Sequence, residues 1–287
     1  MSSGYINWLK TRGVRLFDRG GISWKLYRGS LVPASVAPCF VELDGNEAGQ
    51  LLKESGAFLL RYTSDPCENQ TEWWYVMCDS FETGRLSSKM RNQIRFSSRH
   101  CSVRRIDALW LSTNGYGCYS NAFKRYDGSS PISREDFYEN IMATYDGPFE
   151  YWGVFVGNSL AGYCQCIIEG KNAATNVIKS DPVFLKFYSS YALISALVTN
   201  YIVNNGMSLS NGSRSVSHDT NIQDFLLKFG FRKQFCRLNV VYRPWLKAAV
   251  RSLYPFNGLI GRLPDKGPVQ KIKSVLFQER LRRACHV

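Results

Sequence analysis

The chain has 287 residues, of which 45% are hydrophobic and 14% aromatic, and its formal net charge is +13. This apolar content excludes a globally disordered chain, and the length suits one large domain or two modest ones. The positive charge predicts an anionic partner, which can be nucleic acid, a phosphate-bearing molecule or an acidic membrane surface.

The cysteines and the hydrophobic stretches indicate a soluble cytoplasmic protein. Nine cysteines are scattered without CxxC spacing, which is typical of reduced thiols rather than of a secreted disulfide framework. The most apolar stretch, 183–203, carries Lys186 and several hydroxyl and amide side chains, so we expect a buried helix there and not a membrane span. Cys164 and Cys166 share a strand face without further ligands nearby, so we predict core packing and no metal site.

The first 38 residues are basic and interleaved with aromatic side chains. Two interpretations stay open: a loosely packed arm, or an interfacial anchor whose aromatic side chains enter lipid while its arginines meet headgroups. An α/β alternation begins at Cys39. It predicts a strand at 40–43, a helix at 46–55 that ends at Gly56, and strands at 57–62 and 73–77.

An amphipathic helix is predicted over 87–99, beginning at a hydroxyl cap, and a strand follows over 103–106. Arg91, Arg95 and Arg99 recur at four-residue spacing on one face, and no acidic residue lies between residues 85 and 105. Because such an unbalanced row repels itself, it favours an anionic partner over a merely solvated face.

The second half of the chain contains a continuous run of predicted elements. Residues 114–130 are rich in turn-forming types, and we place a domain boundary there, before a helix that Ser133 caps and that runs to about Thr144. The elements after it are a hairpin of strands 151–156 and 159–168 around Gly157-Asn158, a third strand at 175–178, a long apolar helix at 182–205, a strand at 207–210, a polar loop at 211–220, a helix at 221–228 and a strand at 235–242.

This order of elements, together with three sequence phrases, resembles the GNAT acyltransferases, and most closely their FemAB-like branch. The phrases are YWGVFVGNSLAGY at 151–163, NIQDFLLKFGF at 221–231 and LSSKMRNQIR at 86–95. The resemblance implies an α/β fold, with a GNAT-like mixed twisted sheet flanked by helices and a partial N-terminal GNAT-like lobe. We therefore divide the chain into a basic arm (1–38), the partial lobe (39–125), the acyltransferase domain (126–243) and a basic tail (244–287).

The resemblance also implies where the acyl donor binds. In GNAT domains a pair of neighbouring strands splays apart and holds acyl-CoA in the gap, with its pyrophosphate on the N-terminus of the long helix. That terminus corresponds to Lys186, Tyr188, Ser189, Ser190 and Tyr191, which we assign to binding acyl-CoA, a co-substrate and not a permanently bound cofactor. The glycines of a typical GNAT phosphate loop are missing from this stretch. Charged tRNA, the donor of FemAB-type transfer, is therefore the alternative.

Transfer in this class is the direct attack of an acceptor amine on a thioester or ester, which needs a route for the proton. The polar loop contains His218, the candidate base near neutral pH, and Asp219, which can orient it. Arg214 and Asn211 are the candidate substrate-binding residues, and Tyr242 is a candidate catalytic residue. An alternative interpretation places His218 and Asp219 in the N-cap region of the following helix.

The sequence thus predicts an N-acyltransferase that moves an acyl group from acyl-CoA to an amino group of a small molecule or of a cell-envelope glycan precursor. One alternative is a FemAB-like peptidyl transferase that uses aminoacyl-tRNA. Another is a non-catalytic protein that binds nucleic acid or a membrane on a GNAT scaffold. The basic termini predict peripheral contact with the anionic inner face of a membrane.

Overall fold

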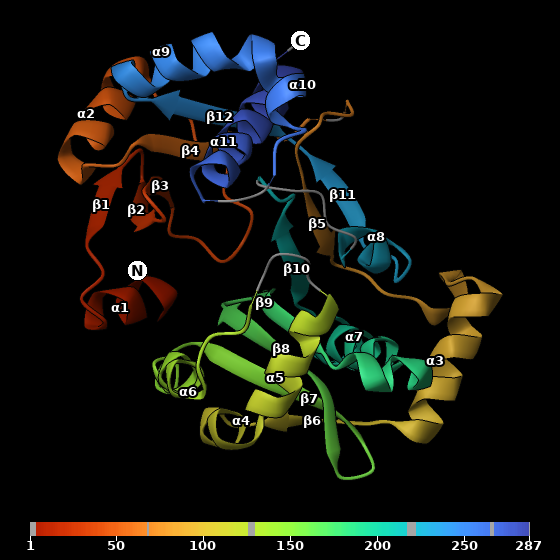
Figure 1. Ribbon diagram of the computed structural model, residues 1–287. Coiled ribbons are helices and arrows are strands. Elements are labelled where there is room, and N and C mark those ends of the chain that lie inside the picture. The colour runs from red at the N-terminus through yellow and green to blue at the C-terminus, as the bar shows by residue number, and fades with distance from the viewer. Residues whose placement is uncertain (1–3, 68, 126–129, 217–221, 265–266, 287) are drawn as a thin grey trace. The chain divides into compact units, whose positions relative to one another are not determined.

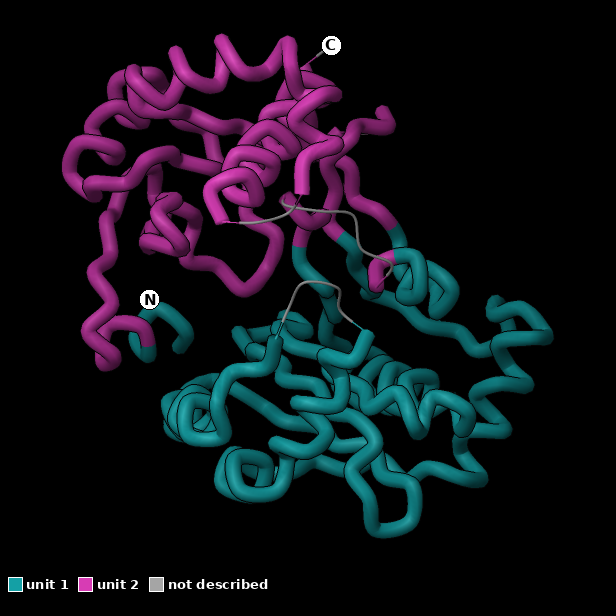
Figure 2. The backbone as a smooth tube through the Cα atoms, in the orientation of Figure 1, with its two compact units in different colours: residues 1–8, 76–212, 224–232 teal, residues 9–75, 213–223, 233–287 magenta. Residues whose placement is uncertain are grey.

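The computed structural model describes residues 4–67, 69–125, 130–216, 222–264 and 267–286. The chain forms two compact units, which Figure 2 colours separately. Unit 1 comprises residues 1–8, 76–212 and 224–232, and unit 2 comprises residues 9–75, 213–223 and 233–287. The units interleave along the chain, whereas the sequence analysis expected four consecutive segments. The boundary between them passes through α1 (Gly4–Thr11), β5 (Trp74–Cys78), β10 (Ser208–Ser213), α8 (Ile222–Leu227) and β11 (Arg232–Phe235).

Unit 1 is built on a mixed sheet (Figure 1). An antiparallel meander of β7 (Phe149–Val156), β8 (Ser159–Glu169) and β9 (Asn172–Ser180) forms its centre. β6 (Ser102–Ile106) pairs antiparallel with β7, and β10 pairs parallel with β9. The predicted hairpin is confirmed, because Val156 pairs with Ser159 across Gly157. Gly157 has a φ of +57°, which a tight hairpin turn requires and glycine adopts without strain.

Helices cover both faces of this sheet. The helices and short helical turns of unit 1 are η1 (Thr83–Arg85), α3 (Ser88–His100), α4 (Ala108–Asn114), α5 (Tyr116–Ala122), η2 (Phe123–Arg125), α6 (Arg134–Met142), η3 (Pro182–Phe187), α7 (Ser189–Val198) and the π-helical turn η4 (Thr199–Asn204). Two successive residues of β7 show which helices lie on which face, because neighbouring side chains of a strand point to opposite faces of the sheet. Tyr151 packs with Leu111 of α4 and Ile141 of α6, whereas the Trp152 indole donates to the Tyr201 hydroxyl of η4 at 2.9 Å.

Unit 2 contains the second mixed sheet, in the order β1 (Leu16–Arg19), β2 (Ile22–Tyr27), β3 (Ser30–Pro33), β4 (Leu59–Ser64) and β12 (Arg237–Tyr242). β3 and β4 are parallel and the other neighbours are antiparallel. α2 (Gly45–Ser55) contributes Leu51 to a core with Trp24, Leu31 and Leu60, all fully buried. The remaining helical segments are α9 (Pro244–Leu253), η5 (Tyr254–Phe256), α10 (Asn257–Ile260) and α11 (Gly267–Ala284).

Three expectations about secondary structure before residue 125 were wrong. Residues 16–33 form strands around the buried Trp24 and are neither a loose arm nor an exposed anchor. The predicted strand at 40–43 is reduced to a single bridge between Phe40 and Thr63. The turn-rich stretch after residue 114 contains α5, which packs on the sheet through Cys118 because small side chains allow a close approach.

Removing the cap of α2 is expected to destabilise unit 2. The Asp44 carboxylate accepts from the Glu47 amide at 2.7 Å, and the Glu47 carboxylate accepts from the Asp44 amide at 3.2 Å. Asp44→Ala removes one half of this reciprocal pair, so we expect urea denaturation to show a loss of about 1 kcal/mol in unfolding free energy. The exposed Glu42 offers the control, because Glu42→Ala should change stability by less than about 0.5 kcal/mol. Equal effects of the two substitutions would contradict the capping role.

Candidate functional site

The parallel strands β9 and β10 are paired at one end only. Their register comprises three residue pairs, from Asn172–Ser208 to Ala174–Ser210. At the next position the contacts between the strands are made by side chains and not by backbone pairing. The Thr175 hydroxyl donates to the Ser210 carbonyl at 3.2 Å, and the Asn211 amide donates to Thr175 Oγ1 at 2.6 Å. β9 continues to Ser180 while it stays paired with β8. The described residues therefore contain two neighbouring strands that separate after these three pairs, with Asn211 at the point of separation.

The segment after β9 starts with a buried carboxylate and ends with a left-handed residue. Asp181 accepts from the Val183 amide at 3.0 Å and from the Asn121 side chain at 2.7 Å, which fixes the start of η3. Tyr188, at φ +55°, ends η3 and precedes α7. The predicted long helix over 182–205 is therefore divided into η3, α7 and the π-helical η4. Because of this division, α7 has a separate N-terminus at Ser189, beside the sheet.

The first turn of α7 carries two serines with different surroundings. The Ser190 hydroxyl lies 3.1 Å from that of Ser180, so this turn is tied to the end of β9. Ser189 is fully buried, and its hydroxyl has no hydrogen-bond partner among the described residues. A helix N-terminus also presents unpaired amides and the positive end of the helix dipole. Because Ser189 is enclosed, the residues of this turn that reach the surface are the half-buried Tyr188, Ser190 and Tyr191, and a helix start of this kind favours an oxygen-rich anion.

Aromatic side chains line the same turn. The rings of Tyr188 and Tyr191 lie 5.3 Å apart, and Tyr191 contacts Phe225 of α8 at 5.0 Å and Phe229 at 5.7 Å. Burial and the neighbouring Tyr188 raise the pKa of Tyr191, and a hydrogen bond with Gln93 offsets only part of this rise. The Tyr191 phenol therefore keeps its proton at neutral pH and is available as a hydrogen-bond donor.

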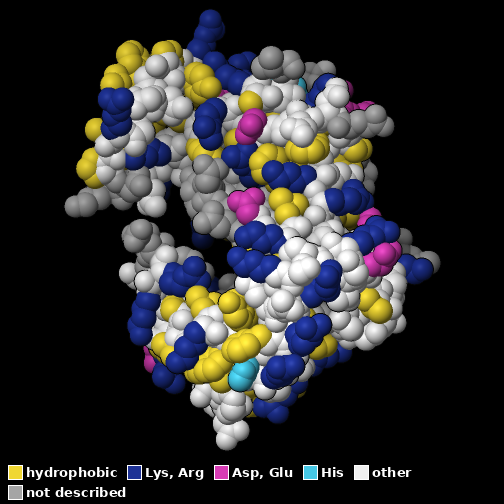
Figure 3. Space-filling view, turned by 90° about the vertical axis from the view of Figure 1, so that its right-hand side faces the viewer, with side chains coloured by type: hydrophobic (Ala, Val, Ile, Leu, Met, Phe, Trp, Pro, Cys, Tyr) yellow, Lys and Arg dark blue, Asp and Glu magenta, His cyan; other side chains and the backbone are white. Residues whose placement is uncertain are grey.

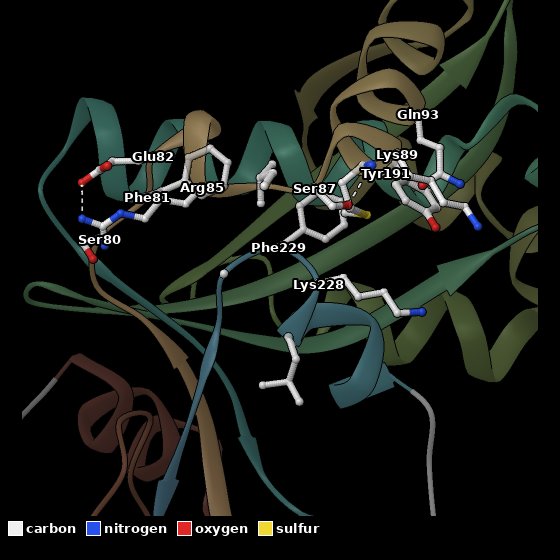
Figure 4. Close-up of a pocket in the computed structure, with 14 residues that line it drawn as sticks. Ser80, Phe81, Glu82, Arg85, Ser87, Lys89, Gln93, Tyr191, Lys228 and Phe229 are labelled. Atoms are coloured by element: carbon white, nitrogen blue, oxygen red, sulfur yellow. Dashed lines mark hydrogen bonds and ion pairs between the residues drawn. The ribbon is translucent and has the colours of Figure 1, made fainter.

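A pocket of about 560 Å³ lies against this end of α7 (Figure 4). Its walls come from the stretch between β5 and α3, from the first turns of α3, from Tyr191 and from the end of α8 with the residues after it. Figure 4 shows Lys89, Gln93 and Tyr191 grouped at one end, with Lys228 extending to the same side and the pair Glu82–Arg85 at the other end.

The pocket carries an excess of positive charge. Arg85 is neutralised by Glu82 at 2.9 Å. Lys89 and Lys228 form no ion pair with any described residue, so their ammonium groups are available to a ligand. Sequence reasoning missed both lysines. The signals that could have located them are the Ser87 cap that starts α3 and the Phe-Gly-Phe sequence after Lys228, because each fixes the end of a helix.

The residues predicted from the sequence lie in different surroundings. Lys186 is exposed and its ammonium group lies 5.2 Å from the centre of the Phe187 ring. In unit 2, the Arg214 guanidinium binds the Glu72 carboxylate at 2.5 Å and lies over the Trp74 ring. His218 and Asp219 fall outside the described residues, so their roles stay predictions.

Tyr242 lies in the interior of unit 2. Its hydroxyl donates to the Glu279 carboxylate at 3.1 Å, and burial raises the pKa of this phenol well above its ordinary value. A tyrosine in this state holds its proton firmly, and its proposed catalytic role stays a prediction.

The described residues show no metal site and no membrane span. No group of three or more potential metal ligands comes together among them, and Cys164 and Cys166 are both buried with their sulfurs 3.6 Å apart. Within the same described ranges, no helix has the length and hydrophobicity needed to cross a membrane.

Solved structures with the same architecture place this arrangement in a known fold. The sequence matches no protein-family model and no curated protein. A C-terminal domain (DUF2156) assigned to a lysylphosphatidylglycerol synthetase from Agrobacterium fabrum is similar, with a TM-score of 0.58, 11% identity, and coverage of 88% of this chain and 90% of that one. FemX is similar with a TM-score of 0.56, 10% identity, and coverage of 88% and 92%.

A third similar structure is L-PGS from Bacillus licheniformis, with a TM-score of 0.54, 10% identity and coverage of 95% of both chains. This chain has a GNAT-like fold of the FemAB type. The separated strands β9 and β10 lie beside the N-terminus of α7, where the sequence analysis expected the acyl donor, and binding of that donor stays a prediction. The identities of 10 to 11% establish the GNAT-like fold alone.

Proposed function

We propose that this protein is an N-acyltransferase that moves an acyl group from acyl-CoA to an amino group of a small molecule or of a cell-envelope glycan precursor. The observation that carries the proposal is a strand pair that separates beside a helix N-terminus, with a basic pocket against the same turn. A phosphate-bearing carrier needs cations and backbone amides at one end and a narrow channel for its extended arm. Unit 1 offers both.

In the proposed reaction the acceptor amine attacks the thioester carbonyl of the donor. A carbon–nitrogen bond forms, the carbon–sulfur bond breaks, and the amine proton passes to a base and finally to the thiolate that leaves. His218 is the proposed base, and Asn211, at the point where the strands separate, is the proposed substrate contact. We expect His218→Ala to lower the transfer rate by about a hundredfold or more.

Binding of CoA itself is the direct test of this proposal. Isothermal titration of the full chain with CoA is expected to show one site with a dissociation constant below about 1 mM, weakened by salt because lysines contribute to the site. Absence of binding at millimolar CoA would remove acyl-CoA as the donor.

A second candidate keeps the transfer chemistry and uses aminoacyl-tRNA as the donor. The observation that favours it is the arginine row of α3, where Arg95 and Arg99 are exposed and Arg91 is half-buried. The absence of glycines between β9 and α7 also favours tRNA over CoA, because without them the backbone approaches a pyrophosphate less closely. Retention of tRNA on a filter, with affinity that falls steeply as salt increases, would support this donor if CoA does not bind.

A further inference from the structure

Unit 2 exposes a row of large apolar side chains near the end of the chain. Five of them lie between residues 245 and 263, with exposed fractions from 37% to 63%: Trp245, Leu253, Phe256, Leu259 and Leu263. They belong to α9, η5, α10 and the turn after it, which follow one another along unit 2 (Figure 1). We call this set the α9–α10 face. Soluble surfaces rarely gather this much apolar area without a binding partner.

Helix geometry explains why these side chains stay outside the core. α9 packs on unit 2 through the buried Val250 and the half-buried Leu246. With about 100° of rotation per residue, Trp245 lies about 100° around α9 from Leu246 and starts an exposed apolar stripe, whereas Leu253, seven residues after Leu246, lies on the buried side and is the least exposed of the five. Phe58 extends the stripe, since its ring lies 6.1 Å from that of Trp245 and it is 54% exposed. The exposed side chains are aromatic at Phe58, Trp245 and Phe256 and aliphatic at Leu259 and Leu263.

The charges around the face have one sign. Lys247 and Arg251 are exposed on the other flank of α9, and Arg262 is exposed after α10. The sequence has no aspartate or glutamate from residue 225 through residue 264. On the molecular surface drawn in Figure 3, Lys and Arg side chains clearly exceed Asp and Glu. An apolar stripe flanked by cations is the pattern of helices that lie in the interface of an anionic bilayer.

We propose that the α9–α10 face binds the surface of an anionic lipid bilayer, with Trp245, Phe256 and Leu259 inserted among the acyl chains and the basic residues against the headgroups. Nucleic acid explains the cations but leaves the apolar stripe in water, whereas a bilayer interface satisfies both. The inference does not depend on the proposed transferase activity, because the face belongs to unit 2 and the proposed donor pocket to unit 1.

Sedimentation with lipid vesicles tests the proposal on the full chain. We expect binding to phosphatidylcholine vesicles that contain phosphatidylglycerol to be at least about tenfold tighter than to phosphatidylcholine alone, and to weaken with salt. Phe256→Ser combined with Leu259→Ser should weaken binding to the anionic vesicles by about tenfold or more, because two inserted side chains are lost. Lys247→Gln combined with Arg251→Gln should weaken binding to the anionic vesicles by about tenfold or more, because each lost charge reduces the affinity roughly fivefold.

Matched controls distinguish binding through this face from non-specific hydrophobic or electrostatic binding. Leu109 and Tyr145 of unit 1 are as exposed as the substituted pair, and Leu109→Ser with Tyr145→Ser should leave binding within about twofold. Lys10→Gln with Lys53→Gln serves as the control for charge. Binding that the face variants and the controls reduce equally would overturn the proposal, as would absence of binding to anionic vesicles. Face variants that lose RNA binding and keep vesicle binding would overturn it in favour of a nucleic-acid surface.

Discussion

Replacing Lys89 and Lys228 together by alanine is expected to weaken CoA binding about a hundredfold. Both ammonium groups belong to the pocket against α7, and neither has an acidic partner among the described residues. A cation that meets a phosphate oxygen contributes about 1.5 kcal/mol or more, which is roughly tenfold in affinity for each lysine. Isothermal titration measures the change, and each single variant should show about half of it on the logarithmic scale.

The control for this experiment keeps the same change in net charge. Lys10 and Lys53 are exposed and lie in α1 and α2. Their double alanine variant should bind CoA within about twofold of the unaltered protein. If both double variants weaken binding equally, the affinity comes from overall charge and not from the pocket. The circular dichroism spectra should be unchanged, because none of the four side chains is buried.

The largest expected effect on stability comes from Glu279 of α11. This residue is only 2% exposed, and its carboxylate accepts hydrogen bonds from Arg282 at 2.8 Å, Arg283 at 2.7 Å and Tyr242 at 3.1 Å. Glu279→Gln removes the charge that holds both guanidinium groups. We expect a loss of about 2 kcal/mol in the free energy of unfolding, less than for a fully enclosed pair because both arginines reach solvent. Urea denaturation measures it, and Glu54→Gln, at an exposed ion pair with Arg19, should cost less than about 0.5 kcal/mol.

The pH dependence of stability should identify the same carboxylate. Burial alone raises the pKa of Glu279, but hydrogen bonds from Arg282 and Arg283 more than offset it, so the pKa lies below its ordinary value. A lowered pKa means that the stabilisation is complete above the unfolded-state pKa of about 4.3 and is lost as pH falls through the folded-state value. The difference between the unaltered protein and Glu279→Gln should therefore shrink below about pH 4. A difference that stays constant down to about pH 3 would contradict the assignment.

Much of unit 1 could be predicted from local sequence signals. The Ser87 and Ser133 caps, the Gly157 turn and the apolar run of β7 each define their element within one or two residues. Such signals act between neighbours in sequence, so no knowledge of the tertiary structure is needed to read them.

The strands of the first 38 residues were missed for a different reason. In β2, Trp24 alternates with Ser23 and Lys25, a period-two pattern that is short and lies within a basic stretch. Its strand character depends on pairing with β1 and β3 and on the core around Trp24. These contacts form only in the folded unit. The interleaving of the two units was likewise invisible, because it depends on which distant segments pack together.

The candidate site could be predicted only incompletely. The α7 terminus and Asn211 follow from the family resemblance, which gives the order of elements. Lys89 and Lys228 come from helices that are far apart in the chain and meet only at the pocket. Ser189 was predicted for its hydroxyl, but only the folded structure shows that this hydroxyl is buried without a partner among the described residues.

The most direct test of the account is a crystal structure of the protein soaked with CoA. The account predicts phosphate density within hydrogen-bonding distance of the first turn of α7 and of Lys89 or Lys228. It also predicts that the pantetheine arm runs along β9 beyond Ala174, where β10 is no longer paired with it. Density for CoA at another surface, or side chains that fill the space between the two strands with CoA absent, would contradict it.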